Sequence, residues 1–590
     1  MDKKNTIIGG LLIVAAFASF YLGQKFAPPP PPPAPVATTT TATASTPAAS
    51  APTAANAGTA TLATPAPVAA TAEATITTIE NAYLSVHLTN LGGAIRDIAL
   101  RKFPAELHRA DPYIVNERHA DPMLAFVDFP GLDQRTPYTL VSQTATEVVY
   151  RAVLGTQVEV TRRYTLVAQA DDTHDPYQLR HEVTLRNLTE QLVPIPRFAL
   201  AVGTIGPVSD TVYGQRVSTG LSNGDGQTFV HRTDLESSGG FLGIGSHEAK
   251  ATVTTGGSIH WASIDNQFFT AILTPDQPGV GLVTSRLKLI AKAPDDQRNA
   301  YGLAGAAQFD VKPLAAHGET KLGFSLYVGP KEYRRLSNSN VFKADQDKVM
   351  QFGFFKFFSQ ILLTLMTWVH SWLPNWGVAI ILTTLILKIV FVPFTVAASR
   401  SARRMQKIQP EMQAIREKFK DNPQKMQAAT MELFKQHKVN PLGGCIPVLI
   451  TMPFFFGFFQ MLPSAAELRF VPFLWAQDLA APDTVAHLFG LPINIMPILM
   501  GATMIIQMKL TPQPSVDNAQ AKMLKFMPWI FMLFCYSFSC SLALYSTING
   551  LFSIGQQIVI NRMKDDGDPA THPVGTDGLK NVTPRKGGKR

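Results

Sequence analysis

The sequence predicts a polytopic α-helical membrane protein that carries a large antiparallel β domain outside the membrane. Three observations lead to this fold class: long apolar runs in the second half of the chain, short alternating segments in the first half, and basic residues beside the apolar runs. The chain has 590 residues, of which 46% are hydrophobic and 16% charged, with a net charge of +9. This composition fits a membrane protein with a soluble part.

Residues 1–25 are predicted to anchor the chain in the membrane. Lys3 and Lys4 precede an apolar run from Thr6 to Leu22. A removable signal peptide stays open as an alternative, because small residues resembling a cleavage site lie inside the run, but its continuation favours an uncleaved anchor. Residues 26–72 are rich in Pro, Ala and Thr and can bury no core, so we expect an extended, disordered tether outside the membrane.

Residues 73–333 are predicted to form one large β-sandwich of the supersandwich type. Apolar and polar side chains alternate in short segments bounded by Gly, Pro, Asn and Asp, as in Glu147 to Gln169. The three cysteines lie in apolar runs elsewhere, so this domain is expected to fold without disulfides. The chain has no zinc-type spacing of Cys or His, and we expect no metal and no cofactor.

Apolar length and flanking charge predict six spans with both termini in the cytoplasm. From Phe354 to Pro374 the polar residues share one helical face, which predicts a helix lying at the outer interface. The run from Phe526 to Ile560 is too long for one crossing and is divided at Ser539-Cys540-Ser541. The predicted segments are a linker with the interfacial helix at 334–375, spans at 376–397, 442–462, 491–508, 526–538 and 541–560, a cytoplasmic helical hairpin at 398–441, an outer loop at 463–490, a cytoplasmic loop at 509–525 and a basic cytoplasmic tail at 561–590.

Lys388 lies in the middle of the otherwise apolar stretch from Ala379 to Ala397. A charge there costs about 2.5–3.5 kcal/mol even on lenient insertion scales. The lysine is too far from the cytoplasmic end of the span to snorkel, and the other predicted spans offer no acidic partner. Thr384 and Thr395 share its helical face. This pattern predicts that Lys388 faces a water-filled cavity inside the membrane.

A second polar stripe lies in the last predicted span. Ser546, Asn549, Ser553 and Gln556 recur at helical spacing. Two interpretations remain open for it: a polar cavity wall, or hydrogen bonds that hold neighbouring helices together.

The predicted cytoplasmic hairpin is strongly basic. Arg400, Arg403 and Arg404 open it, and Met412 lies in an apolar stripe on its first arm. Such a stripe usually means that the two arms pack together, although methionines also suit adaptable contacts with partners.

At Lys438 to Leu462, "KVNPLGGCIPVLITMPFFFGFFQML", and Gln520 to Phe531, "QAKMLKFMPWIF", the sequence resembles the YidC family of membrane protein insertases. The intramembrane cation, the basic hairpin and the order of segments fit the Gram-negative form of that family. Lys388 stands where the family usually has arginine, Thr451 where glutamine is frequent, and Ser539-Cys540-Ser541 where a Pro-Ser-Gly turn is common.

The resemblance implies a bacterial inner-membrane insertase and chaperone, not an enzyme, with a periplasmic domain and a five-helix core. A hydrophilic groove would receive nascent membrane proteins, with Lys388, Thr384, Thr395, Ser546 and Asn549 lining it. Other implied partners are the Sec translocon, the ribosome and anionic lipid; no small-molecule substrate is implied. Arg400, Arg403, Arg404 and Met412 would contact clients or the ribosome, and the tail residues Arg585, Lys586, Lys589 and Arg590 would contact ribosomal RNA or lipid.

Two rival functions remain open. An intramembrane lysine also suits ion coupling in a secondary transporter, although the matching pairs of broken spans typical of such proteins are not evident. The β domain resembles the sugar-mutarotase type of sandwich, so a sugar-binding domain on an anchor is the second rival. An ATP-driven transporter is disfavoured because no Lys is followed by Ser or Thr, which removes the phosphate-binding loop.

Overall fold

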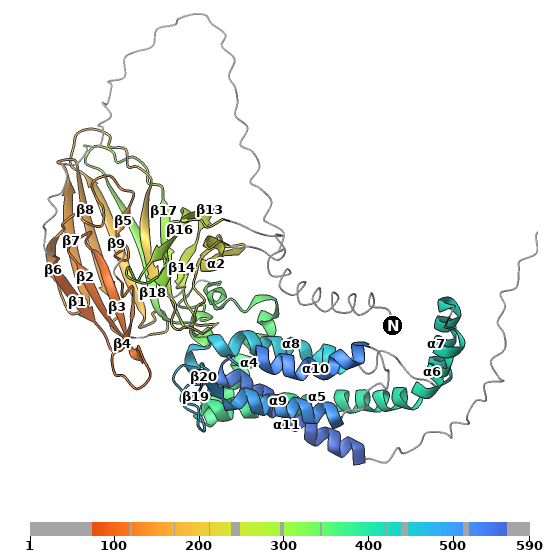
Figure 1. The fold of residues 1–590 in the computed structure, drawn as a ribbon. Helices are drawn as coiled ribbons and strands as arrows, with labels where there is room; N and C mark the ends of the chain where they lie inside the picture. The colour runs from red at the N-terminus through yellow and green to blue at the C-terminus, as the bar shows by residue number, and fades with distance from the viewer. Residues whose placement is uncertain are drawn as a thin grey trace, which may run out of the picture.

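A computed structural model describes residues 74–562, apart from 119–120, 170, 212, 238–247, 295–299, 343–344, 421, 438–445 and 511–518. The predicted anchor and tether and nearly all of the tail lie outside these residues, as does Lys438 to Cys445 of the family-like motif. Figure 1 shows a β domain at one end of a group of helices and the helices α6 (Gln409–Lys418) and α7 (Pro423–Gln436) at the other.

The β domain consists of three antiparallel sheets, built from strands between Ile76 and Pro330. In spatial order, the nine-stranded sheet contains β12 (Gln227–His231), β11 (Ser218–Ser222), β14 (Trp261–Asp265), β15 (Phe269–Pro275), β18 (Glu319–Pro330), β9 (Gln178–Asn187), β8 (Val158–Leu166), β7 (Glu147–Leu154) and β6 (Thr139–Gln143). The five-stranded sheet contains β13 (Thr252–Ile259), β16 (Gly279–Lys288), β17 (Tyr301–Phe309), β10 (Phe198–Ile205) and β5 (Phe126–Val127). The four-stranded sheet contains β1 (Ile76–Glu80), β2 (Leu84–Thr89), β3 (Ala94–Pro104) and β4 (Pro112–Val115). A short helix, α2 (Arg232–Leu235), follows β12.

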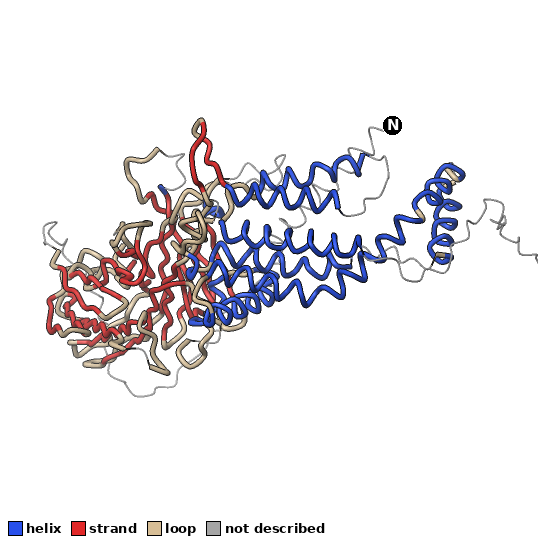
Figure 2. The backbone as a smooth tube through the Cα atoms, turned by 90° about the horizontal axis from the view of Figure 1, so that it is seen from below, coloured by secondary structure: helices blue, strands red, loops and turns tan. Residues whose placement is uncertain are grey.

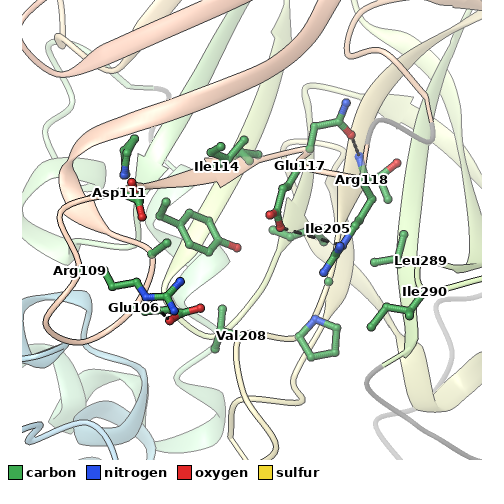
Figure 3. A pocket seen from close by; sticks show the side chains of 18 residues that line it. Glu106, Arg109, Asp111, Ile114, Glu117, Arg118, Ile205, Val208, Leu289 and Ile290 are labelled. Atoms are coloured by element: carbon green, nitrogen blue, oxygen red, sulfur yellow. Dashed lines mark hydrogen bonds and ion pairs between the residues drawn. The ribbon is translucent and has the colours of Figure 1, made fainter. Parts of the chain in front are cut away.

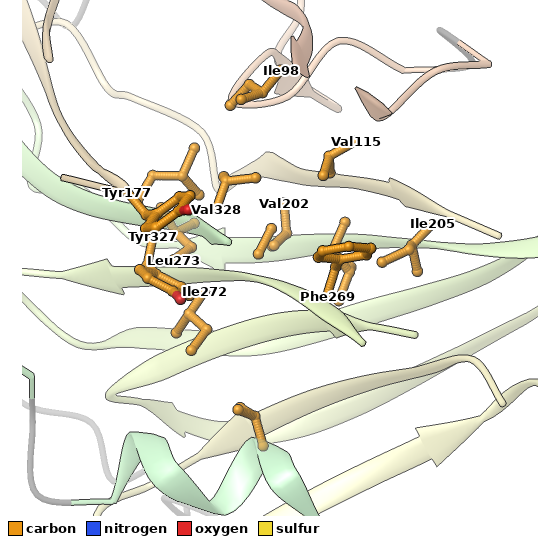
Figure 4. Close-up of a cluster of buried hydrophobic side chains, with 14 of the residues drawn as sticks. Ile98, Val115, Tyr177, Val202, Ile205, Phe269, Ile272, Leu273, Tyr327 and Val328 are labelled. Carbon is orange, nitrogen blue, oxygen red and sulfur yellow. The ribbon is translucent and has the colours of Figure 1, made fainter. Parts of the chain in front are cut away.

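Alternation of side chains explains why these segments form a sandwich. Along β8, every second residue from Val158 to Leu166 is buried, so one face of the strand meets the core. The core is aromatic and aliphatic, with Phe269, Tyr177 and Tyr327 among its large side chains (Figure 4). Burial of this apolar surface is the main driving force for folding of the domain.

One buried position of β8 carries a charge. Arg162 is 0% exposed, and its guanidinium donates a 2.6 Å hydrogen bond to the carbonyl of Gly92 and a second bond to the carbonyl of Leu124. The same group lies over the ring of Phe126. It thus satisfies two loop carbonyls that would otherwise be buried without donors.

Helices make up most of the chain after the β domain. They are α3 (Tyr333–Leu336), the 3₁₀ turns η2 (Gln346–Met350) and η3 (Gly353–Phe355), α4 (Lys356–Trp372), α5 (Trp376–Lys407), α6, α7, α8 (Ile446–Met461), the 3₁₀ turns η4 (Leu462–Ser464) and η5 (Ala466–Leu468), α9 (Ile495–Leu510), α10 (Ala519–Phe534) and α11 (Cys540–Arg562). A two-stranded hairpin, β19 (Thr484–Leu488) and β20 (Leu491–Asn494), precedes α9. Of the described helices, one segment, Trp376–Met405, is long and apolar enough to cross a membrane by length and composition.

Several helix ends differ from the predicted span ends. The segment predicted to begin a span at 491 starts as β20, and its helix begins at Ile495, directly after Asn494, whose side chain donates to the carbonyl of Tyr536. The helix predicted to end at 397 continues to Lys407, so α5 itself supplies the first part of the predicted hairpin. The division expected at Ser539-Cys540-Ser541 occurs slightly earlier, since α10 ends at Phe534 and α11 begins at Cys540.

The surface of α4 is more apolar than the sequence pattern predicts. Its buried side contains Ser359, Leu362, Leu363, Met366 and Val369. Large apolar side chains are exposed on the rest of it, including Phe357, Trp368 and Trp372. Tryptophan is enriched at membrane–water interfaces, so this surface suits an interfacial position.

The β domain is joined to the helical region by specific contacts, several of them with residues 463–490, the segment predicted as an outer loop. Arg469, just after η5, donates hydrogen bonds of 2.6 Å and 2.9 Å to the carbonyls of Pro104 and Ala105. Gln267, between β14 and β15, donates a 2.6 Å bond to the carbonyl of Pro463. These side-chain bonds to backbone fix the two regions relative to each other.

Candidate functional site

A row of polar contacts joins α5 to α11. Lys388 lies within the apolar part of α5, and its ammonium donates a 2.8 Å hydrogen bond to the hydroxyl of Ser553 on α11. The Ser553 hydroxyl in turn donates a 2.8 Å bond to the carbonyl of Asn549, one turn earlier in its own helix. Both Lys388 and Ser553 are half-buried. The Ser553 hydroxyl thus accepts a hydrogen bond from the lysine ammonium while it donates its own hydrogen to the Asn549 carbonyl.

Hydrogen bonds from two further residues, Gln556 and Arg403, continue this row toward the ends of the helices. Gln556 on α11 donates to the hydroxyl of Thr395. The Arg403 guanidinium donates to the carbonyl of Ile560 and, at 2.8 Å, to the side-chain oxygen of Asn561. We call Lys388, Thr395, Arg403, Ser553, Gln556 and Asn561 the α5–α11 polar row.

The spacing of the polar row follows from helix geometry. On α5 its members are seven and eight residues apart, and their partners on α11 follow in the same order. About two helical turns separate residues at such spacing, so the members share one face of α5. The two helices therefore lie side by side and run in the same direction, as their positions in Figure 1 also indicate.

Pro393 lies in α5 between Lys388 and Thr395. Proline has no backbone N–H, so the helical hydrogen bond to the carbonyl four residues earlier is missing there. The Thr395 hydroxyl donates to the carbonyls of Phe391 and Val392 in the same turn. These bonds fix the hydroxyl rotamer of Thr395, whereas the carbonyl left without its helical donor by Pro393 is that of Ile389.

A glycine sets the distance between α11 and α9. A Cβ atom at Gly550 would lie 2.6 Å from the hydroxyl of Thr503 and 2.8 Å from its Cβ, so the backbone of α11 lies against the Thr503 side chain of α9 here. Small residues at such contacts are typical of helices that pack closely in membranes. Because α11 is held by α9 on one side and by the polar row on another, Ser553 is placed by packing as well as by hydrogen bonds.

The residues predicted to line a groove do not all lie together. Lys388 and Thr395 belong to the polar row, and Asn549 takes part through its backbone carbonyl. Thr384 is 1% exposed, and its hydroxyl donates at 2.7 Å to Ile380 of its own helix, so it does not face an open surface. Ser546 is half-buried on α11. The hydroxyl of Thr384 is satisfied by its own helix, and its place in the lining of a groove stays a prediction.

The residues predicted on the cytoplasmic hairpin have different positions. Arg400 and Arg404 are exposed, whereas Arg403 is turned to α11. Met412 is half-buried and packs with Ile408, Ile415 and Leu433 in the contact between α6 and α7. Met412 thus takes part in packing between the two arms, and its contact with a partner stays a prediction. The tail residues Arg585, Lys586, Lys589 and Arg590 lie outside the described residues.

Three members of the row were not among the predicted site residues. Ser553 and Gln556 belong to the second polar stripe, so a signal for them was present, but the sequence did not say which residues of the stripe meet α5. Asn561 lies beyond the apolar run, and its link to Arg403 had no sequence signal.

The β domain contains a partly open cavity of about 470 Å³ (Figure 3). Its wall carries charged residues, and Glu106 and Arg109 form an exposed ion pair of 3.0 Å there. Burial raises the pKa of the lining residue Tyr113 to about 12, and its hydroxyl accepts a 2.8 Å bond from Asn266. Among the described residues, no histidine lines this cavity and no cluster of three potential ligands could hold a metal ion.

Two protein families match the chain. Residues 76–365 match the family described as the YidC periplasmic domain, and residues 368–567 match the family described as 60Kd inner membrane protein. A protein named membrane protein insertase YidC from Anaeromyxobacter sp. (strain Fw109-5) is 35% identical over 320 residues, which cover 53% of this chain and 54% of that protein. The chain spans about half the length of the curated relatives it matches.

Solved structures resemble different shares of this chain. A structure described as an active YidC insertase with the first transmembrane domain resolved has 18% identity and a TM-score of 0.32, covering 83% of this chain and 93% of that chain. A galactose mutarotase-like protein from Lactobacillus casei has 13% identity and a TM-score of 0.30, covering 43% of this chain and 100% of that chain. The two family matches are adjacent and take in both the β-sandwich and the helices that carry the polar row, and the chain therefore belongs to the YidC family.

Proposed function

We propose that this chain is a membrane protein insertase and chaperone that inserts inner-membrane proteins and helps them fold. The relatives named membrane protein insertase support this activity, and the position of Lys388 is the observation that carries it. A lysine within an apolar helix is expensive in lipid, and such residues usually serve a function.

The proposed arrangement has six spans: the N-terminal anchor, α5, α8, α9, α10 and α11. The β domain lies in the periplasm and both termini lie in the cytoplasm. Support comes from the positions of the β domain and of the basic hairpin α6–α7 at opposite ends of the helices (Figure 1). The turn before α11 also bonds to the outer loop, since Cys540 and Ser541 donate to the carbonyls of Ala481 and Leu479.

The polar row suggests how a client would be received. Lys388 is a positive charge whose position is held by Ser553, and Thr395, Asn549 and Ser546 lie along the same two helices. A hydrated groove at this place would attract the acidic, hydrophilic tail of a client and shorten the apolar path that the tail crosses. Transfer of the client's apolar segment into lipid supplies the driving force, so no nucleotide, cofactor or covalent step is needed.

Other partners would bind at the two ends of the molecule. The exposed Arg400 and Arg404 are suited to first contact with an acidic client or with ribosomal RNA. Arg585, Lys586, Lys589 and Arg590 would bind ribosomal RNA or anionic lipid, and the periplasmic domain would reach the Sec translocon.

The rival functions have less support. Within the described part of the chain, no contact pairs Lys388 with a carboxylate, as ion coupling would favour; its ammonium donates to a serine hydroxyl. The carboxylate of Glu106 in the β-domain cavity is paired with Arg109 rather than free for sugar chemistry.

Reconstitution of the full chain into proteoliposomes would test the proposal. Insertion of a single-span client with an acidic tail is scored by protection of the tail from added protease, beside uptake of small labelled solutes. The expected result is client protection without solute uptake. Solute uptake without client protection would support the transporter instead.

A further inference from the structure

The hairpin of β19 and β20 exposes an apolar tip. Phe489 is 96% exposed, Leu491 71% and Leu488 56%, and Val485 is also exposed. Figure 2 shows the hairpin projecting away from the helices, crosswise to them, at the end nearest the β domain. Exposed apolar side chains gathered at one tip usually mark an interaction site.

The base of the hairpin is rigidly held. Asn494 donates a 2.7 Å bond to the carbonyl of Tyr536, and the Tyr536 hydroxyl donates a 2.7 Å bond to the carbonyl of Pro492. Across the hairpin, Thr484 donates to the side-chain oxygen of Asn494 at 2.6 Å. The tip is therefore held at a fixed place beside the helix ends.

The chemistry of the tip suits lipid better than water. Residues 484–494 contain no Asp, Glu, Lys or Arg. Phe489, at the turn with a φ of 51°, holds a side chain that is 96% exposed, and transfer of such an apolar surface out of water is favourable.

The hairpin is also continuous with a surface that faces lipid in the proposed arrangement. It leads directly into α9, on which Ile498, Leu499 and Ile506 are exposed. An apolar surface on a spanning helix is expected to contact acyl chains. The tip extends that surface sideways at its outer end.

We propose that the tip formed by Leu488, Phe489 and Leu491 inserts into the outer leaflet of the membrane and anchors the outer loop there. The insertion is shallow, because the outer edges of both strands carry unpaired backbone groups that cannot be taken into the hydrocarbon core. The tip lies at the boundary between lipid headgroups and acyl chains, so the lipid of the outer leaflet covers it. The inference rests on the periplasmic position of residues 463–490 in the proposed function.

Photocrosslinking tests the proposal in the full chain. A benzophenone amino acid replaces Phe489, and a matched variant carries it at Val141 of β6, which is 56% exposed and lies on the β domain. After irradiation in lipid nanodiscs, lipid adducts are measured by mass spectrometry. The expected result is about tenfold more lipid adduct at 489 than at 141, since apolar contact with lipid is present only at the first site. Equal yields at the two sites overturn the proposal.

Irradiation in cells distinguishes contact of the tip with lipid from contact with a protein partner. A lipid adduct at 489 supports the proposal, whereas a specific protein adduct in its place overturns it. Labelling of His487→Cys with a membrane-impermeant maleimide tests the side of the membrane. If the maleimide reacts from outside and no lipid adduct forms at 489, insertion of the tip is overturned but the proposed topology is not. Reaction only after lysis overturns the proposed topology as well.

Discussion

Lys388 on α5 donates a 2.8 Å hydrogen bond to Ser553 on α11. The bond holds a positive charge between two parallel helices, and the serine hydroxyl is already committed to the Asn549 carbonyl as a donor. A charged donor bonded to a neutral acceptor keeps its net charge, unlike a lysine in an ion pair. The site thus presents a cation whose position is fixed and whose charge is not neutralised by Ser553.

If that charge attracts clients, substitutions of Lys388 should rank by charge. In an insertase-depleted strain, Lys388→Arg should insert a client with an acidic tail normally, and Lys388→Ala and Lys388→Glu should fail, with Glu the worse of the two. The matched control is Lys356→Glu, which makes the same charge change at the exposed start of α4. Normal insertion by Lys388→Ala would show that the charge is dispensable for that client.

Arg469→Ala should loosen the β domain from the helices. The variant loses two hydrogen bonds to carbonyls of the β domain and the contact with the Phe269 ring, which we expect to cost about 2–4 kcal/mol at the junction. Limited proteolysis should then cleave the connecting segments faster. Arg109→Ala is the control, since its ion pair with Glu106 is exposed and should contribute less than about 1 kcal/mol. Equal cleavage of both variants would contradict a fixed junction.

Sequence reasoning succeeded where one local property decides the structure. The alternation in Val158 to Leu166 is enough to predict a half-buried strand, because side chains of a strand point to opposite faces. Lys388 is conspicuous because charge is rare in apolar runs. Neither inference needs knowledge of the neighbours in space.

A sequence pattern does not determine which group a polar side chain meets. Thr384 shares a face with Lys388, yet its hydroxyl bonds back to Ile380, an option that every helical threonine has. Arg403 sits among exposed arginines in sequence but reaches the last turn of α11, whose end carbonyls lack helical partners and attract cations. Only the packing of α5 beside α11 decides such cases.

Asp265 should make the stability of the β domain depend on pH. Burial raises the pKa of its carboxyl to about 6, although Lys331 and the hydroxyl of Ser263 partly oppose the rise. The folded state therefore binds more protons than the unfolded state between about pH 4 and 6, and stability falls as pH rises through that range.

Asp265→Asn removes this titration. Relative to the parent, the variant should gain up to about 1.4 kcal/mol per pH unit between pH 4 and 6 and no more above about pH 7. The measurement is the melting temperature of the β-sheet circular dichroism signal, with the exposed Asp225→Asn as control. A constant difference between variant and parent across this range would contradict the raised pKa.

Gly550→Ala should separate α9 from α11. The added methyl group would meet the Thr503 side chain at 2.6–2.8 Å, too close for any real contact, so one helix must move. Overpacking of this kind typically costs about 1–3 kcal/mol. The shift would also move Ser553, one turn further along α11, away from Lys388. We therefore expect lower thermal stability in detergent together with weaker client insertion.

Gly555→Ala is the matched control in the same helix. A Cβ atom at Gly555 has nothing within 4 Å, and alanine favours a helix by up to about 1 kcal/mol over glycine, so this variant should be as stable as the parent or slightly more so. Loss of stability in both variants would mean that glycine is needed in α11 for a reason other than its contact with Thr503. Loss in Gly550→Ala alone, restored in the double variant by Thr503→Gly, which removes both the hydroxyl and the Cβ atom that the new methyl group meets, would establish the contact as the point that sets the spacing of the helices.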